Sequence, residues 1–350
     1  MINLQNNETS LDLYEDKERK EKVSERRNKY SEYCDFVYYE SSVTPGLMLA
    51  MRVLKPEKPS YILAGTHGWH MSIRDFKEMD TPASEYLTLQ IDMRGRAFSD
   101  GEPDCNGWEL YDVIDACEYA KKHYSEYIVD PEVVYFEAGR GGGGNSYAIT
   151  AKFPDYFAAA SAMCGISDYG VWYDNDKCGE FRDEMDVWIK PKNEGYDEAY
   201  ASRSGIAAVQ NLCTPLAVTH GEKDIRVPAY HARNYVSEAE RCGKTDLVRY
   251  MEMPGIGGAD HWTNASEEDK RKMEIFREQN RAEHRLPVTI PRKGKLKVLG
   301  YLFTKEFSVI CESIDTVGEI AYNLDTDYFE FIGNGKYCLK KGNFLKNKGD

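Results

Sequence analysis

Five short apolar runs, each followed by a turn and a helix-like stretch, constrain the fold more than any other feature of this sequence. The runs are YILAGTHG (61–68), YLTLQIDMRG (86–95), VVYFEAG (133–139), FAAASAMCG (157–165) and PLAVTHG (215–221). Helical apolar spacing is found between and after them, at 107–124, 144–153 and 229–242. Strands that alternate with helices and are apolar enough to be buried on both faces predict an α/β fold with a mostly parallel central sheet and helices on both faces.

The regions that flank this series differ from it in composition. Residues 11–33 are dense in Glu, Lys and Arg, so we expect residues 1–34 to form a charged, solvated helical arm. Segments 35–40 and 47–54 form a hairpin-like entry into a main domain at 35–286. The remainder, 287–350, consists of short strand-like runs broken by Gly, Asp and Asn, so we expect a small C-terminal all-β appendage there.

A glycine run follows the predicted strand 133–139 and precedes a helix that we expect to begin near Asn145. A strand, a sharp glycine-rich turn and a helix form the context of the nucleophile elbow, G-x-S-x-G. Gly139 and Gly143 fit the outer glycines, which places Gly141 at the nucleophile position, where a serine is expected and no hydroxyl is present. A phosphate-binding loop is the weaker alternative, because no Lys follows the run and no acidic residue completes a dinucleotide fingerprint.

The partners that an elbow requires follow in the expected order. Asp224 lies just past the strand PLAVTHG, and His261 lies in the loop MPGIGGADHW. The imidazole would accept the proton of the nucleophile, while the carboxylate would fix its tautomer. The strand YILAGTHG ends beside Gly68, where a backbone N–H can point at a developing oxyanion, and the second donor would be the N–H of Gly142.

Four further residues compete for catalytic roles. We expect His67 and His70 to be structural hydrogen-bonding groups, although both lie beside the oxyanion segment. Ser146 lies seven residues past the strand end, about two helical turns too deep to meet His261. Cys164 ends the next strand and is expected to be a buried small hydrophobic residue.

Several motifs together resemble the prolyl oligopeptidase-like branch of the α/β-hydrolases, whose relatives include acetyl xylan esterases and cocaine-esterase-like hydrolases. IDMRGRAFSDGEP resembles their D-x-R-G-x-G-x-S-x-G segment, and DEAYASRSGIAAVQNLCTPLAVTHGEKDIRVP resembles their Y-R-x-R-S-P stretch and the following T-P-x-L-x-x-H-G-x-x-D-x-x-V-P. FEAGRGGGGNSYAITAKFPDYFAAASAMCGISDY resembles their elbow, helix and next strand, so the likeness covers about residues 35–275. It implies an α/β-hydrolase fold, Asp224 and His261 as acid and base, and Trp69 and Gly142 as oxyanion donors. Gly141 departs from the pattern and puts activity in doubt.

The block 169–211 interrupts the strand series and is rich in Tyr, Trp, Asp and Lys. Insertions at this edge of a sheet commonly form lids and substrate walls. Its Trp172, Tyr173 and Trp188, with Trp262 beside the predicted base, could stack on the rings of a substrate, or each could belong to the core.

The motifs predict a serine-hydrolase-type acyl hydrolase, an esterase for a small or carbohydrate-linked ester, in a form that lacks its nucleophile. An inactivating Ser→Gly change, a natural pseudoenzyme that keeps the pocket for ligand binding, and a peptidase of the prolyl oligopeptidase type all remain open. A purely structural or assembly protein is a further class, but it explains none of the site residues.

Composition narrows the partners. A net charge of -14 argues against nucleic acid, and no apolar stretch is long enough to span a membrane. The nine cysteines are scattered without C-x-x-C pairing, and the first residues lack a signal-peptide pattern. We therefore expect a cytoplasmic protein with reduced thiols, no metal and no cofactor, which acts on a small-molecule ester; a homo-oligomer is compatible with the sequence.

Overall fold

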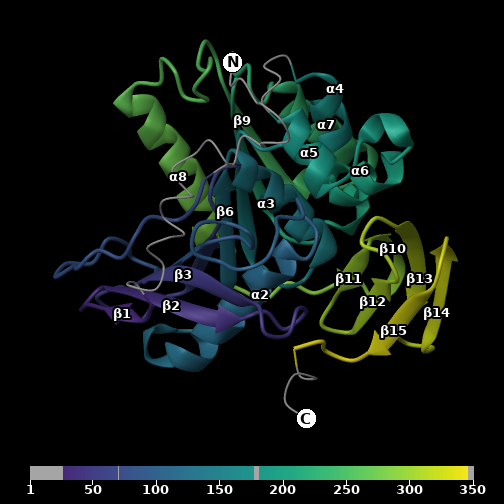
Figure 1. Ribbon diagram of the computed structural model, residues 1–350, viewed down its shortest axis with the longest axis horizontal. Coiled ribbons are helices and arrows are strands. Elements are labelled where there is room, and N and C mark those ends of the chain that lie inside the picture. Colours follow the sequence, from purple (N-terminus) through teal and green to yellow (C-terminus); the bar gives the residue numbers. More distant parts are fainter. Residues whose placement is uncertain (1–26, 70, 177–180, 346–350) are drawn as a thin grey trace.

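The computed structural model describes residues 27–69, 71–176 and 181–345, which form a large sheet flanked by helices and a separate smaller sheet (Figure 1). The large sheet has the strand order β1-β2-β3-β5-β4-β6-β7-β8-β9. All neighbours from β5 to β9 are parallel, whereas the pairs β1–β2, β2–β3 and β3–β5 are antiparallel. Its strands are β1 (Lys29–Tyr30), β2 (Cys34–Glu40), β3 (Met48–Leu54), β4 (Ile62–Gly65), β5 (Leu87–Ile91), β6 (Val134–Gly139), β7 (Ala159–Met163), β8 (Leu216–Gly221) and β9 (Val248–Met253).

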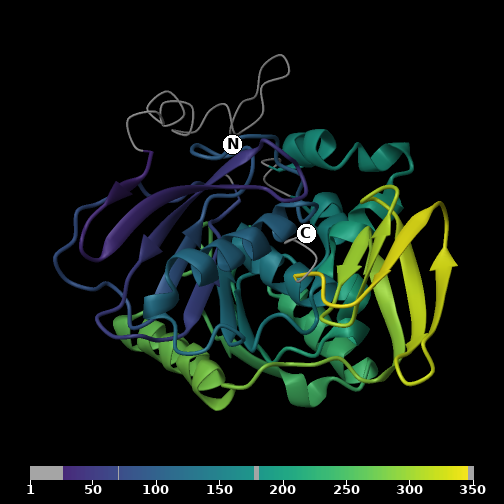
Figure 2. The ribbon, with the colours of Figure 1, turned by 90° about the horizontal axis from the view of Figure 1, so that it is seen from below.

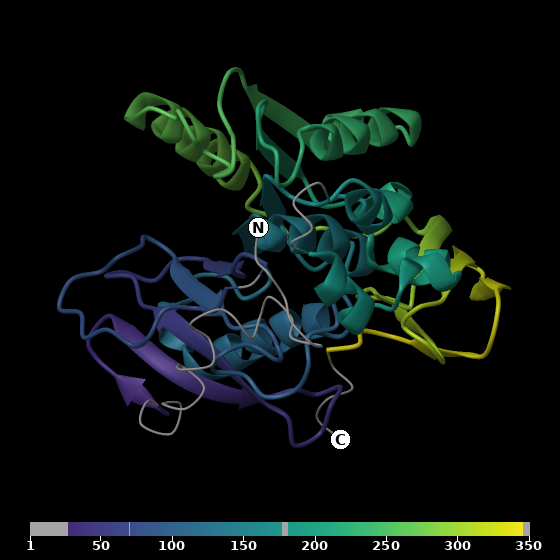
Figure 3. The same cartoon turned by 45° about the horizontal axis from the view of Figure 1, so that its top comes forward.

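Helices cover both faces of this sheet. The α-helices are α2 (Glu109–His123), α3 (Gly141–Lys152), α4 (Tyr169–Asp174), α5 (Arg182–Trp188), α6 (Asp197–Arg203), α7 (Tyr230–Arg241) and α8 (Glu267–Glu283). Short 3₁₀ helices lie at Ser125–Tyr127, Lys192–Glu194, Gly205–Asn211 and Thr245–Leu247. The helices α2, α3 and α7 contribute to one core cluster with the sheet, and α8 contacts β7 and β8 from the other side (Figures 2 and 3). Because both faces are covered, the parallel strands are buried as their apolar sequences require.

The C-terminal unit is an antiparallel six-stranded sheet with the order β14-β13-β10-β11-β12-β15. It has a core of its own and attaches to the α/β unit through aromatic rings, among which Trp108 and Tyr301 stack with ring centroids 4.7 Å apart. Its strands are β10 (Lys293–Leu299), β11 (Tyr301–Phe303), β12 (Phe307–Cys311), β13 (Val317–Asn323), β14 (Tyr328–Gly333) and β15 (Tyr337–Lys341). The predicted α/β fold with a small β appendage is therefore confirmed.

The structure changes two local expectations and adds two elements that the sequence analysis did not predict. Of the arm predicted at 1–34, residues 1–26 lie outside the described part, and the described end is no helix, because Lys29 and Tyr30 pair with β2. The helix expected from Asn145 already begins at Gly141. The sequence analysis also missed β9 and α8. Helix α8 is charged along its length, with few buried residues, and it begins with a capping box between Ser266 and Asp269.

Two general expectations can be compared with the described residues. None of their helices is long and apolar enough to cross a membrane. The eight cysteines of the described part are all free thiols, and most are buried; the ninth, Cys178, lies outside it.

Candidate active site

The turn between β6 and α3 forms an elbow whose apex is Arg140. The strand ends at Gly139 and the helix begins at Gly141, so Arg140 is the one residue between them. Its backbone angles, φ 62° and ψ −126°, lie in a region that residues other than glycine adopt only where the surrounding structure enforces it. Such a strained turn holds the nucleophile in a strand–elbow–helix motif. Gly141 does not have this conformation and is already helical, so the prediction that it occupies the nucleophile position is wrong.

The glycines after the apex allow close approach of neighbouring backbone. A Cβ atom on Gly141 would lie 2.6 Å from the backbone nitrogen of Trp69. One on Gly142 would lie 2.8 Å from the carbonyl oxygen of His67, and one on Gly143 would lie 2.6 Å from a carbonyl oxygen of β7. The run therefore reflects how closely α3 packs against the ends of β4 and β7.

This register also moves one of the two expected oxyanion donors. The second donor of an elbow is the N–H of the residue after the nucleophile, which is Gly141 when Arg140 is the apex. Gly142, the predicted donor, instead packs against the segment that leaves β4. Trp69, the other predicted donor, has its backbone nitrogen beside Gly141, so the backbone N–H groups of these two residues lie close together.

The predicted acid and base lie together. Asp224 Oδ2 lies 2.5 Å from His261 Nδ1, and both side chains are almost fully buried. The other carboxylate oxygen of Asp224 accepts hydrogen bonds of 3.0 Å from the backbone N–H groups of Arg226 and Val227. These bonds fix the carboxylate, which in turn orients His261 with Nδ1 as the donor. Nε2 is then the ring nitrogen that can accept a proton.

The side chain of Arg140 bridges the two loops of the site. Its Nη2 lies 3.6 Å from Asp260 Oδ2 in the loop of His261, and its Nη1 lies 3.8 Å from the sulfur of Met71. Its Cδ would also meet a Cβ atom placed on Gly68 at 3.4 Å. A cationic side chain therefore stands where a nucleophilic hydroxyl would be needed. The Asp260 carboxyl accepts a backbone hydrogen bond and lies near Arg140, and its pKa is lowered.

His67 is a structural residue, as expected. Its Nδ1 lies 2.8 Å from the carbonyl oxygen of Gly68, and the backbone N–H of Met93 donates to its Nε2 at 3.0 Å. Nδ1 must therefore carry the proton. Burial, helped by the charge of Arg96, lowers the pKa of His67 to about 3 and keeps the ring neutral. His70 lies outside the described residues.

The two alternative nucleophiles have other surroundings. Ser146 is fully buried inside α3, and its hydroxyl donates to the carbonyl oxygen of Ser161 at 2.8 Å. Cys164 is also buried, and burial together with the nearby Asp224 raises the pKa of its thiol well above the usual value. Among the described residues, Cys164, His220 and Asp224 form one group close enough to hold an ion, but Asp224 already accepts the bonds described above.

The insertion 169–211 holds Trp69 in place. The indole Nε1 of Trp69 donates to the buried carboxylate of Glu184 in α5. Its ring contacts those of Trp172 and Trp188, with centroids 5.0 and 5.2 Å apart. The insertion therefore fixes the side chain of Trp69 beside the elbow.

The aromatic residues predicted to stack on a substrate are mostly core. Trp172, Tyr173 and Trp188 are buried in one cluster with the rest of the insertion, although Trp188 also lines a small hollow beside Gly141. Trp262 is half-buried and packs with Met253 and other residues of a separate cluster. The prediction of a stacking surface is thus not met, and the alternative that these rings belong to the core holds for the insertion.

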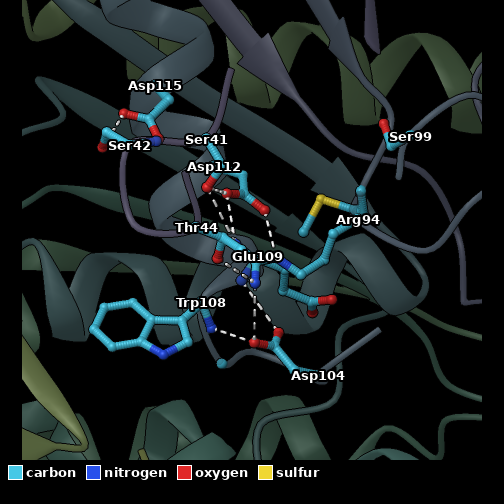
Figure 4. A network of polar contacts seen from close by, with 12 residues as sticks. Ser41, Ser42, Thr44, Arg94, Ser99, Asp104, Trp108, Glu109, Asp112 and Asp115 are labelled. Atoms are coloured by element: carbon cyan, nitrogen blue, oxygen red, sulfur yellow. Dashed lines mark hydrogen bonds and ion pairs between the residues drawn. The ribbon is translucent and has the colours of Figure 1, made fainter. Parts of the chain in front are cut away.

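A buried ionic network supports the segment after β5 (Figure 4). Arg94 donates to both carboxylate oxygens of Asp112 in α2, at 2.6 and 2.8 Å. Burial raises the pKa of Asp112 to about 6, although the bonds from Arg94 oppose this shift. The paired fork anchors the segment that carries Arg96 toward the site. Glu109 of α2 accepts a hydrogen bond of 2.6 Å from the backbone N–H of Asn106, and burial raises the pKa of its carboxyl group to about 7.

Sequence analysis missed Arg140, Arg96 and Glu109. An arginine inside a glycine run was the available signal for Arg140, and the R-G-R string was the signal for Arg96. Neither string shows by itself where the arginine side chain lies in the fold.

Comparisons with known proteins agree with this architecture. The model of the prolyl oligopeptidase family matches residues 84–279, more than half of the chain. The esterase LipC of Mycobacterium tuberculosis is 26% identical over 225 residues, which cover 58% of this chain and 53% of LipC. The β appendage lies beyond the matched family region.

Solved structures with the same fold include larger enzymes. An acylaminoacyl peptidase of Pyrococcus horikoshii superposes with a TM-score of 0.56 and 17% identity, covering 70% of this chain and 40% of the peptidase. A puromycin-hydrolyzing peptidase of Mycobacterium tuberculosis gives 0.54 and 15%, covering 69% and 40%. The chain thus spans about half the length of LipC and about 40% of each of these two enzymes, and at such identities the likeness shows the fold alone.

Proposed function

Because the chain belongs to the prolyl oligopeptidase family of serine hydrolases, we propose that it has lost acyl-enzyme chemistry and binds an acyl compound without cleaving it through a serine. One observation carries the proposal: the elbow apex is Arg140. A guanidinium is cationic at all ordinary pH values and is not a nucleophile, so His261 has no hydroxyl to deprotonate. The remaining parts of the site, namely Asp224, His261 and the N–H groups of Trp69 and Gly141, support recognition of a carbonyl or carboxylate group.

The class of acyl compound follows from the relatives. LipC is named an esterase, and the structural neighbours are named for the hydrolysis of acylaminoacyl peptides and puromycin. Esters and amides share the carbonyl oxygen that a pair of N–H donors can bind. We therefore propose a small ester, amide or the derived acid as ligand, and a peptidase-like ligand has the same support as an ester.

The experiment compares the natural chain with Arg140→Ser. We expect no covalent labelling of the natural chain by a fluorophosphonate and no turnover of p-nitrophenyl acetate above about 1 s⁻¹, the low end of ordinary enzymes. Arg140→Ser should be labelled at residue 140, and Arg140→Ser/His261→Ala should not, because the serine then lacks its base. Arg140→Ala is the matched control for loss of the arginine alone. Labelling of the natural chain would overturn the proposal.

The intact pair of Asp224 and His261 favours one second candidate. Its 2.5 Å contact would let His261 activate a water molecule directly, so that an activated ester is hydrolysed without an acyl-enzyme. Turnover of p-nitrophenyl acetate that is lost in His261→Ala, in the absence of labelling, would identify this activity.

A further inference from the structure

A small hollow adjoins the elbow, and both Trp69 and Gly141 line it. It has a volume of about 20 Å³, and its lining includes Trp69, Arg96, Glu109, Gly141 and Trp188. A space of this size accepts about one water molecule or one flat head group of a few atoms. Its lining also includes His67 and Gly68, which follow β4 in the chain.

Arg96 is the unusual residue of this lining. Arg96 is only 5% exposed, and neither its Nε nor its Nη1 has a hydrogen-bond partner within the described part of the chain. The guanidinium lies over the ring of Trp188, 4.6 Å from the centroid, which orients it but satisfies no N–H. The carboxyl group of Glu109 lines the same hollow and interacts electrostatically with this guanidinium, but no ion pair joins the two side chains. Buried N–H donors without an acceptor are unfavourable, so the free donors of Arg96 at the cavity wall call for an anionic acceptor.

The opposite side of the hollow offers further donors. Gly141 is the first residue of α3, a helix of 12 residues, whose N-terminal N–H groups and dipole favour negative charge. The backbone nitrogen of Trp69 lies next to it, as the 2.6 Å approach to the Cβ position of Gly141 shows. A buried guanidinium and a helix N-terminus therefore face one small space.

We propose that this hollow binds the carboxylate of a small organic acid, with Arg96 on one side of the carboxylate and the N–H groups of Trp69 and Gly141 on the other. The inference rests on the proposed function and makes it more specific, since the acid is the product side of acyl chemistry. Glu109 in the lining disfavours a second negative charge, and this selects a carboxylate over a phosphate.

The test titrates the full chain with sodium acetate and follows the fluorescence of its tryptophans, two of which line the hollow. We expect saturable binding of acetate and none of acetamide, which has the same shape without the charge. Arg96→Gln should weaken acetate binding about 10- to 100-fold, the range for loss of a hydrogen bond to a charged group. Arg249→Gln, which removes a half-buried arginine on β9 away from the hollow, is the matched control and should bind like the natural chain.

Several outcomes of this titration would contradict the inference. Equal binding of acetate and acetamide, tighter binding of inorganic phosphate than of acetate, or unchanged binding in Arg96→Gln would overturn it. If Arg96→Gln does not fold, the comparison of acetate with acetamide on the natural chain still decides. Absence of acetate binding in a chain that also resists fluorophosphonate would reject the carboxylate site and leave the proposed function standing; fluorophosphonate labelling would reject the proposed function first.

Discussion

Replacing Gly141 with alanine tests the register of the elbow, because the added methyl group has no room. Its Cβ would lie 2.6 Å from the backbone nitrogen and 2.7 Å from the Cα of Trp69, distances that require the backbone to shift. Overpacking of this kind costs about 1–3 kcal/mol, and the better helix propensity of alanine returns at most about 1 kcal/mol. We expect a net loss of about 1–2 kcal/mol.

The loss should be visible in thermal unfolding as a Tm lower by about 2–8 °C, using the range for domains of this size. Gly170→Ala is the matched control, since a Cβ at this α4 position meets neighbours only at 3.4 Å or more. Its Tm should stay within about 2 °C of the natural chain. A Gly141→Ala chain as stable as the natural protein would refute the close approach. So would fluorophosphonate labelling of Gly141→Ser at residue 141, because it would restore the register in which Gly141 is the apex.

Three further changes should be measurable by urea unfolding. Lys152 is fully buried under the ring of Tyr301 with no hydrogen-bond partner among the described residues, and burial lowers its pKa well below the usual value. Lys152→Met should therefore raise the free energy of unfolding by about 1–2 kcal/mol at pH 7. It should also abolish the increase in stability between about pH 7 and 10 that deprotonation of the natural amine produces, and a less stable variant would contradict this reasoning. His67 has a pKa of about 3 in the fold, so its contribution is present above pH 6.5 and lost as the pH falls toward 3, by up to about 1.4 kcal/mol per unit. His67→Gln should flatten the decline between pH 6.5 and 4, and an unchanged slope would show that other groups cause it. Asp315→Asn removes the 2.8 Å ion pair with the buried Arg203 and should cost about 1–3 kcal/mol, whereas equal stability would mean that the pair does not hold the β unit.

The parallel strands of the large sheet could be predicted from the sequence because they are buried on both faces and are therefore mostly apolar. Strand β9 was not, since most of its residues are only half-buried and it carries Arg249 and Glu252. Helix α8 was missed for a related reason: it buries little beyond Met273, Asn280 and Arg281, so its apolar periodicity is weak. Edge elements pack with few apolar residues, and a pattern of hydrophobicity cannot detect them.

The site was predictable up to one residue of register. Asp224 and His261 were placed by their loops and chain order, and the structure brings them into contact. The elbow was shifted because a glycine run satisfies the motif twice, once around Gly141 and once around Arg140 with Ala138 as the first small residue. Only the backbone angles distinguish the two, since the apex alone has a positive φ. The burial of the insertion's tryptophans was equally hidden, because a ring that lines a pocket and a ring that fills one have the same sequence.

The aromatic rings between the two sheets link parts of the chain that are made at very different times. Phe153, at the end of α3, stacks on Phe303 at 5.6 Å and meets Phe344 at 6.0 Å, far later in the chain. Tyr111 of α2 joins the same group. During synthesis the α/β unit could therefore form its sheet before the rings that cover this face of α2 and α3 exist. Contacts so distant in sequence slow folding. The exposed aromatic face in that interval is the surface on which nascent chains of this protein would associate with one another or with a chaperone.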